Sequence, residues 1–123
     1  MKHLSSSQLD LMLLIWDMNE TVTRRSIQKK LPPEKWQPTT INTMLNKLVK
    51  DEFLTVHQEG REYVYTTAVS KDVYMKYEGR GLLKTLYDNS VKSFVASVCD
   101  ASNLSEDDIS HLYELLEKLK EEN

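Results

Sequence analysis

The chain has 123 residues, 40% hydrophobic and 28% charged, with a formal net charge of −3, a composition typical of a globular protein large enough to bury a core without disulfides or a structural metal. No apolar run approaches the roughly 20 residues that span a bilayer, and the first residues lack the apolar segment of a secretory signal, which argues against a membrane protein. The lone cysteine, Cys99, excludes an internal disulfide, so we expect a reduced, cytoplasmic protein.

Two amphipathic helices are predicted at the start of the chain. The serines at positions 5–7 can cap the first helix, and the spacing i, i+3, i+4, i+7 predicts its buried face: Leu9, Met12, Leu13 and Trp16. Thr23 is the predicted N-cap of the second helix, which places Ile27 and Leu31 on one face. The helix ends at Pro32-Pro33, because a residue that precedes proline is driven out of α geometry.

The third predicted helix has the clearest pattern. Pro38 suits its first position, where a missing N–H costs nothing. Its apolar stripe follows the helical spacing and consists of Ile41, Met44, Leu45, Leu48 and Val49. The opposite face has no acid before Asp51; it carries Thr39, Thr43, Asn46 and Lys50, flanked by Thr40, Asn42 and Lys47.

The hydrophobic period then changes to two, which predicts a β-hairpin over 53–65 with Gly60 in its turn. Three helices followed by a two-stranded hairpin is the element order of a winged helix-turn-helix. We therefore expect a mainly α fold with a small β-hairpin. Residues 1–69 are predicted to form a winged-helix DNA-binding domain, and residues 70–123 a helical dimerisation domain.

The chain is predicted to be helical again from Ser70. Gly79 and Gly81 separate two apolar stripes; they are either a hinge or packing accommodations, and we favour packing. Ser90 and Ser105 can cap two further helices. The apolar stripes of these helices have no fold of their own to complete, and they predict pairing with a second copy of the chain through Val91, Phe94, Val95, Val98, Ile109, Leu112, Leu116 and Leu119.

The charge is unevenly distributed. Between Val22 and Lys50 there are seven basic residues and one acid, Glu34, which gives this window a charge of +6. Residues 66–123 carry a net charge of −4. A basic N-terminal half joined to an acidic C-terminal half indicates a division of labour.

The third helix has the chemistry of a DNA-reading element. A major groove admits one α-helix, and short hydrogen-bonding side chains read its base edges. The residues predicted to face the groove are Thr39, Thr40, Asn42, Thr43, Asn46, Lys47 and Lys50. Asn42 and Asn46 can each reach an adenine, and the lysines suit phosphates. Backbone and wing contacts are predicted for Arg24, Arg25, His57 and Arg61.

Other kinds of site have little support. The histidines, His3, His57 and His111, have no His or Cys partner at metal-ligand spacing, so we expect no metal and no cofactor. The sequence has no G-x-S-x-G motif or glycine-rich turn, and an enzyme is not predicted. Cys99 is expected to be a buried small hydrophobe, with a redox sensor as the alternative.

Four stretches resemble the penicillinase and methicillin-resistance repressor family (BlaI/MecI/CopY type): LDLMLLIW (9–16), WQPTTINTMLNKL (36–48), GREYVY (60–65) and LSEDDISHLYELLEKL (104–119). The resemblance covers nearly the whole chain. It implies a dimeric winged-helix repressor that binds palindromic operators, typically of TACA/TGTA type, and dimerises through its C-terminal helices.

The chain departs from the family pattern in several places. The family often has Arg where Asn42 and Lys47 stand, and usually a glycine where Glu52 follows the third helix. The C-terminal Cys-x-Cys pairs of copper-responsive members are missing, so copper sensing is not expected. Ser97-Val98 occupies the place of the Asn-Phe bond cleaved in β-lactam-responsive members, so induction by proteolysis cannot be assumed.

The leading hypothesis is therefore a homodimeric repressor that binds double-stranded DNA at an inverted repeat. The alternative is a winged-helix protein-interaction module without sequence-specific DNA binding. The sequence leaves the release signal open between proteolysis, a small-molecule inducer and a redox change at Cys99.

Overall fold

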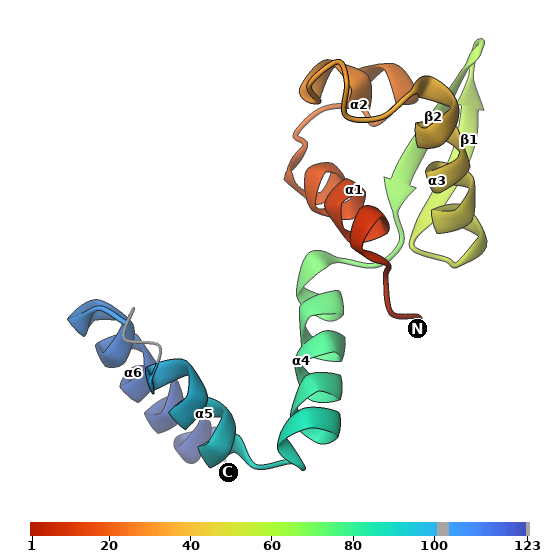
Figure 1. Cartoon of the computed structure of the whole chain (residues 1–123). Helices are drawn as coiled ribbons and strands as arrows, with labels where there is room; N and C mark the ends of the chain where they lie inside the picture. Colours follow the sequence, from red (N-terminus) through yellow and green to blue (C-terminus); the bar gives the residue numbers. More distant parts are fainter. Residues whose placement is uncertain (101–103, 123) are drawn as a thin grey trace. The chain divides into compact units, whose positions relative to one another are not determined.

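The computed structural model describes residues 1–100 and 104–122. Helices α1 (Ser6–Asp17), α2 (Arg24–Lys30) and α3 (Pro38–Lys50) precede strands β1 (Leu54–Glu59) and β2 (Glu62–Thr67), and helices α4 (Lys71–Tyr87), α5 (Val91–Asp100) and α6 (Glu106–Glu122) follow (Figure 1). The predicted fold class, mainly α with a small hairpin in the winged-helix order, is confirmed. The chain divides into two compact units, Met1–Glu78 and Gly79–Asn123.

Helix α1 begins as predicted, but its buried face differs from the prediction. The Ser5 hydroxyl accepts from the Gln8 N–H, and the Gln8 side chain accepts from the Ser5 N–H, which completes a capping box. The buried residues are Gln8, Leu11, Met12 and Ile15. Leu13 is 41% exposed, so its assignment to the core was wrong. Seven of the eight residues from Leu9 to Trp16 are apolar, and two overlapping stripes therefore compete for the core.

Helices α2 and α3 follow the sequence pattern closely. Thr23 caps α2 through the Ser26 N–H, and Ile27 is fully buried. Pro38 opens α3, and Ile41, Leu45 and Leu48 have no exposed surface. Helix α3 packs against both α2 and β1, so its apolar stripe is buried in the core and its polar face is exposed to solvent.

The link from α3 to β1 is a tight C-terminal cap. Phe53 donates its N–H to the Leu48 carbonyl at 2.9 Å, and Glu52 donates to the Val49 carbonyl at 3.1 Å. These two bonds form a Schellman motif, which needs a residue with positive φ after the C-cap. Glu52 occupies that position with a φ of 67°. The backbone therefore adopts the conformation that favours glycine although the side chain is a glutamate.

The hairpin pairs β1 and β2 in antiparallel register, with Val56 opposite Tyr65 and Glu59 opposite Glu62. Its two-residue turn has a positive φ at Gly60, the first loop residue, the pattern of a type II′ turn. On the other edge of β2, Tyr65 forms an isolated bridge to Val22 and donates its N–H to the Val22 carbonyl at 2.9 Å. The hairpin runs alongside α3 (Figure 1).

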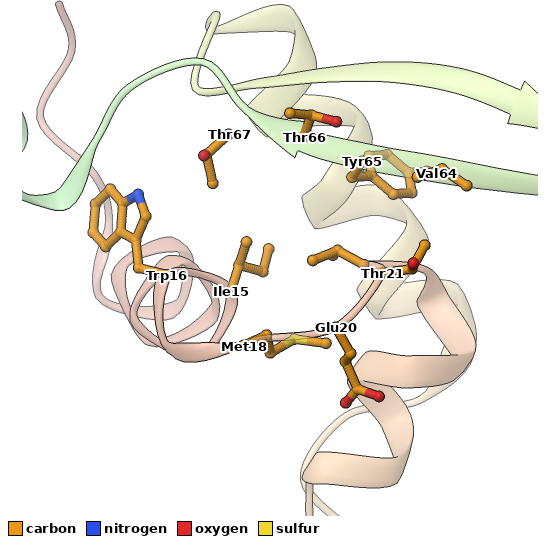
Figure 2. A pocket seen from close by; sticks show the side chains of 10 residues that line it. Ile15, Trp16, Met18, Glu20, Thr21, Val64, Tyr65, Thr66 and Thr67 are labelled. Carbon is orange, nitrogen blue, oxygen red and sulfur yellow. The ribbon is translucent and has the colours of Figure 1, made fainter.

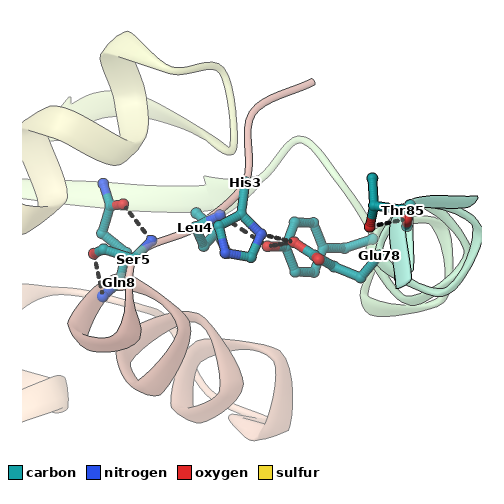
Figure 3. A network of polar contacts seen from close by, with 8 residues as sticks. His3, Leu4, Ser5, Gln8, Glu78 and Thr85 are labelled. Carbon is teal, nitrogen blue, oxygen red and sulfur yellow. Dashed lines mark hydrogen bonds and ion pairs between the residues drawn. The ribbon is translucent and has the colours of Figure 1, made fainter. Parts of the chain in front are cut away.

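Tyr74 of α4 completes the core of the N-terminal unit. Its ring lies 5.8 Å from Trp16 and 5.6 Å from Phe53, and it is 3% exposed. Its hydroxyl accepts from the Leu4 N–H and donates to Glu78, which also contacts His3 (Figure 3). Burial and the bond to Glu78 raise the pKa of Tyr74 to about 12. These contacts extend the compact unit to Glu78, nine residues past the sequence-derived boundary at 69/70.

Many apolar side chains of the C-terminal unit are exposed, among them Val91, Val98 and Leu116. Helix α4 continues through Gly79 and Gly81 without a break. Ser90 caps α5 through the Ser93 N–H, and Ser105 forms a capping box with Asp108, as predicted. No residue of α6 is buried. Cys99 is exposed in the single chain, so the expectation of a buried thiol was wrong: no element of the described chain covers that side of α5.

Candidate nucleic-acid interface

The outer face of α3 is exposed. All seven residues predicted to read DNA are exposed: Thr39, Thr40, Asn42, Thr43, Asn46, Lys47 and Lys50. The apolar side of the same helix is buried in the core, so the polar face must point to solvent. Its polar groups are uncharged amides and hydroxyls over the first two turns, with ammonium groups toward the C-terminal end. Such a surface can donate and accept hydrogen bonds at base edges while its lysines meet phosphates.

One hydroxyl of this face is already committed. Thr43 donates its Oγ1 hydrogen to the Thr39 carbonyl at 2.9 Å, one helical turn earlier. The residue as a whole is exposed. Thr43 is therefore prepared to accept a hydrogen bond or to contact a thymine methyl, but not to donate.

A carboxylate binds two ammonium groups at the C-terminal end of α3. Lys47 Nζ lies 3.6 Å from Asp51 Oδ2, and Lys2 Nζ lies 3.2 Å from Asp51 Oδ1. The Asp51 side chain is 6% exposed, whereas those of Lys2 and Lys47 are 68% and 58% exposed. The hydrogen bond from Lys2, assisted by the charge of Lys47, lowers the pKa of Asp51 below its ordinary value. Sequence reasoning missed Lys2, because it lies 49 positions from its partner.

Some of the basic residues between Val22 and Lys50 are engaged in side-chain contacts, so fewer of them are available for phosphate than the composition indicates. Lys30 pairs with Glu20 at 3.4 Å, and Lys35 approaches Asp10 at 3.9 Å. The guanidinium of Arg24 donates to Gln28, and the side chain is half-buried, whereas Arg25 is exposed. Within residues 1–100 and 104–122, no ion pair involves Arg25, Lys50 or Arg61. Lys29 is likewise exposed and in none of these pairs, so these four are the cations most available for phosphate.

The hairpin tip has a mixed charge. His57 and Arg61 are exposed as predicted, but His57 Nε2 lies 3.0 Å from Glu59 Oε1. Glu59 faces Glu62 directly across the two strands. Arg61 therefore lies between two acidic residues in the sequence, Glu59 and Glu62, which the prediction of a wing contact at Arg61 did not weigh.

A pocket of about 380 Å³ lies in the N-terminal unit between the end of α1 and β2 (Figure 2). Its walls include Trp16, Met18 and Thr67, and its one carboxylate, Glu20, is the partner of Lys30. No histidine or cysteine is among the residues that line it. Across the described residues, no three His, Cys, Asp or Glu side chains gather to hold a metal ion, and no helix is long and apolar enough to cross a membrane.

The family assignment follows from comparison with known proteins. A sequence model of the penicillinase repressor family matches residues 4–118. The chain belongs to the penicillinase repressor family. This confirms the resemblance found in the sequence and places the chain among repressors, which are not enzymes.

Two named relatives align with this chain over more than nine-tenths of their length. The chain is 32% identical over 117 residues to the penicillinase repressor of Bacillus licheniformis, covering 95% of this chain and 91% of that protein. It is 24% identical over 116 residues to the methicillin resistance regulatory protein MecI of Staphylococcus aureus (strain N315), covering 94% of each.

A solved structure of this family supports the fold of the N-terminal unit. The DNA-binding domain of the repressor BlaI, determined in solution, matches with a TM-score of 0.51 and 35% sequence identity. The match covers 60% of this chain and 94% of that domain. The winged-helix assignment of the first helices and the hairpin is thus confirmed by a related structure.

Proposed function

We propose that the chain is a DNA-binding transcriptional repressor that acts as a homodimer in the cytoplasm on an inverted-repeat operator, with α3 of each subunit in a major groove. The outward face of α3 carries this proposal. It combines exposed amides and hydroxyls with a closed apolar side, and the matched domain of BlaI is a DNA-binding domain. Operators of TACA/TGTA type are the first to test.

Backbone contacts complete the proposed interface. Arg25 of α2 and Lys50 at the end of α3 are exposed cations of the helix-turn-helix, and their side chains suit contacts with phosphates. We assign to base edges the residues Thr39, Thr40, Asn42, Thr43 and Asn46. We assign to the flanking DNA backbone the residues Arg24, Lys47, His57 and Arg61. Affinity then depends on counterion release and falls steeply as salt rises.

The homodimer is supported by the apolar surface of the C-terminal unit. Val91, Val98, Leu116 and Leu119 are 56%, 42%, 57% and 46% exposed in the single chain. Apolar side chains exposed in this number on two helices mark an interaction surface. A second copy satisfies it with the same residues on both sides, and two-fold symmetry sets two copies of α3 against two half-sites.

The test is selection of bound fragments from genomic DNA, followed by sequencing and a gel shift. The proposal predicts recovery of an inverted repeat, with saturable binding that a random-sequence duplex competes for weakly. A protein-interaction module would recover no common sequence and show equal competition by any duplex, and that result would overturn the proposal.

A further inference from the structure

The N-terminal residues are fastened to the reading helix and to α4 by three consecutive contacts. Lys2 binds Asp51 at the end of α3. His3 Nδ1 lies 2.6 Å from Glu78 Oε1, and the Leu4 N–H donates to the Tyr74 hydroxyl at 2.8 Å (Figure 3). The Leu4 side chain is 3% exposed. Residues 2–4 are therefore packed as part of the N-terminal unit, and their contacts hold the Lys2 ammonium beside Asp51.

The carboxylate that holds Lys2 is in an unusual position for a helix. The C-terminal end of a helix carries partial negative charge, which disfavours a carboxylate there. Asp51 is nevertheless the C-cap residue of α3, with its carboxylate almost closed to solvent. Two ammonium groups, one on each oxygen, compensate for this placement.

We infer that Lys2 is a further DNA-backbone contact, fixed by Asp51 beside Lys47 on one flank of α3. This inference rests on the proposed DNA-binding function. An ammonium has three N–H donors, and the bond to Asp51 uses one. The Lys2 side chain is 68% exposed, so the other two can donate to a phosphate oxygen. Two ammonium groups on one carboxylate leave a net charge of +1, which attracts a phosphodiester to this flank.

The experiment measures the salt dependence of binding to a random-sequence duplex, which reports phosphate contacts without requiring a known operator. In Lys2→Gln, the slope of log K against log salt should fall in magnitude by about one per subunit. Lys2→Arg should retain the wild-type slope. The matched control is Lys76→Gln: Lys76 is an exposed lysine of the same unit that pairs with Asp72 of its own helix, α4, at 3.2 Å. It should leave the slope unchanged.

A second background separates direct contact from an effect on the fold. If Lys2 only neutralises Asp51, the Lys2→Gln change should have no effect once Asp51→Asn has removed the charge. The amide oxygen that Asp51→Asn introduces can still accept the hydrogen bond from Lys2, so if Lys2 contacts phosphate the slope should still fall in the Asp51→Asn background. Loss of the effect there, or a Lys2→Gln slope equal to that of Lys76→Gln, would overturn the inference while leaving the proposed function intact. A wild-type protein that binds no duplex would instead overturn the proposed function.

Discussion

The backbone N–H of Leu4 donates to the hydroxyl of Tyr74 at 2.8 Å, a bond that joins residues 70 positions apart in a buried site. Replacing Tyr74 by phenylalanine keeps the ring against Trp16 and Phe53 but leaves this N–H without its acceptor. We expect Tyr74→Phe to lower the free energy of unfolding by about 1–3 kcal/mol, the cost of an unsatisfied buried polar group. Urea denaturation measures it.

Tyr63→Phe is the matched control for this change. Tyr63 lies on β2 in the same unit and is 57% exposed. This exposed side chain takes no part in a buried hydrogen bond, so Tyr63→Phe should change the free energy of unfolding by less than about 0.5 kcal/mol. Equal effects of the two substitutions would show that the Leu4–Tyr74 bond contributes nothing specific.

The positive φ of Glu52 gives a stabilising prediction. A residue with a Cβ pays about 1–2 kcal/mol in the left-handed region, which glycine avoids, although glycine gives back part of this through greater freedom in the unfolded chain. We expect Glu52→Gly to raise the free energy of unfolding by about 0.5–1 kcal/mol. Urea denaturation at constant pH measures this change.

Glu52→Ala separates backbone strain from charge. It removes the same carboxylate but keeps a Cβ at a φ of 67°. It should not stabilise the protein. If alanine and glycine gave the same gain, the carboxylate and not the backbone would be the cause.

Asp51 predicts an acid-sensitive contribution to stability. Its pKa is lowered in the folded protein, chiefly by the hydrogen bond from Lys2, so the folded state favours the ionised form. The contribution is complete above the ordinary value of 3.8 and is lost as the pH falls through the lower folded value. Denaturation of wild type and Asp51→Asn over a series of pH values should therefore give curves that converge at acid pH. Parallel curves would contradict it.

The sequence predicted helices well where polar and apolar positions contrast. In α3 the stripe from Ile41 to Leu48 is bounded by polar residues on both sides, so only one face could be buried. In α1 the segment from Leu9 to Trp16 offers apolar residues in nearly every direction. Tertiary packing then decided in favour of Leu11 over Leu13, and no periodicity argument could have chosen between them.

Contacts distant in sequence account for what the pattern missed at the candidate site. Lys2 and Asp51 come together only because Leu4 is buried against the core and Tyr74 fixes the backbone beside it. The ion pair between Lys30 and Glu20 likewise joins the end of α2 to the link that precedes this helix, and helical periodicity does not predict it. The departure at Glu52, in contrast, was visible from the family resemblance, and the backbone there shows why glycine is favoured.

Asn46 gives the sharpest test of base reading. Its amide is exposed at the middle of the outer face of α3 and can make a bidentate pair with adenine. We expect Asn46→Ala to weaken binding to the selected inverted repeat by about 1–3 kcal/mol while sparing binding to a random duplex. Fluorescence anisotropy with both duplexes measures the difference.

Asn19→Ala makes the same chemical change away from α3. Asn19 is exposed on the link between α1 and α2. It should bind both duplexes as wild type does. Equal losses on the two duplexes for Asn46→Ala would argue that the amide does not read a base.

The stripe of α6 that is proposed to form the dimer is uncovered in the single chain. Leu112 is 38% exposed and Leu116 57% exposed, on one face of the helix. Burying a carboxylate in an apolar interface without a partner is costly. Ser110 lies on the opposite face of α6 by helical geometry, so an acid there stays in water.

We therefore expect Leu116→Glu to weaken self-association by about 3 kcal/mol, roughly a hundredfold in the dissociation constant, and Ser110→Glu to leave it unchanged. Sedimentation equilibrium measures both. Truncation after Ser90 should abolish the dimer altogether, since it removes α5 and α6. Because two linked reading heads bind an inverted repeat more tightly than one, Leu116→Glu should also weaken binding to the repeat far more than binding to a single half-site. A Leu116→Glu protein that remains dimeric would place the interface elsewhere on the chain.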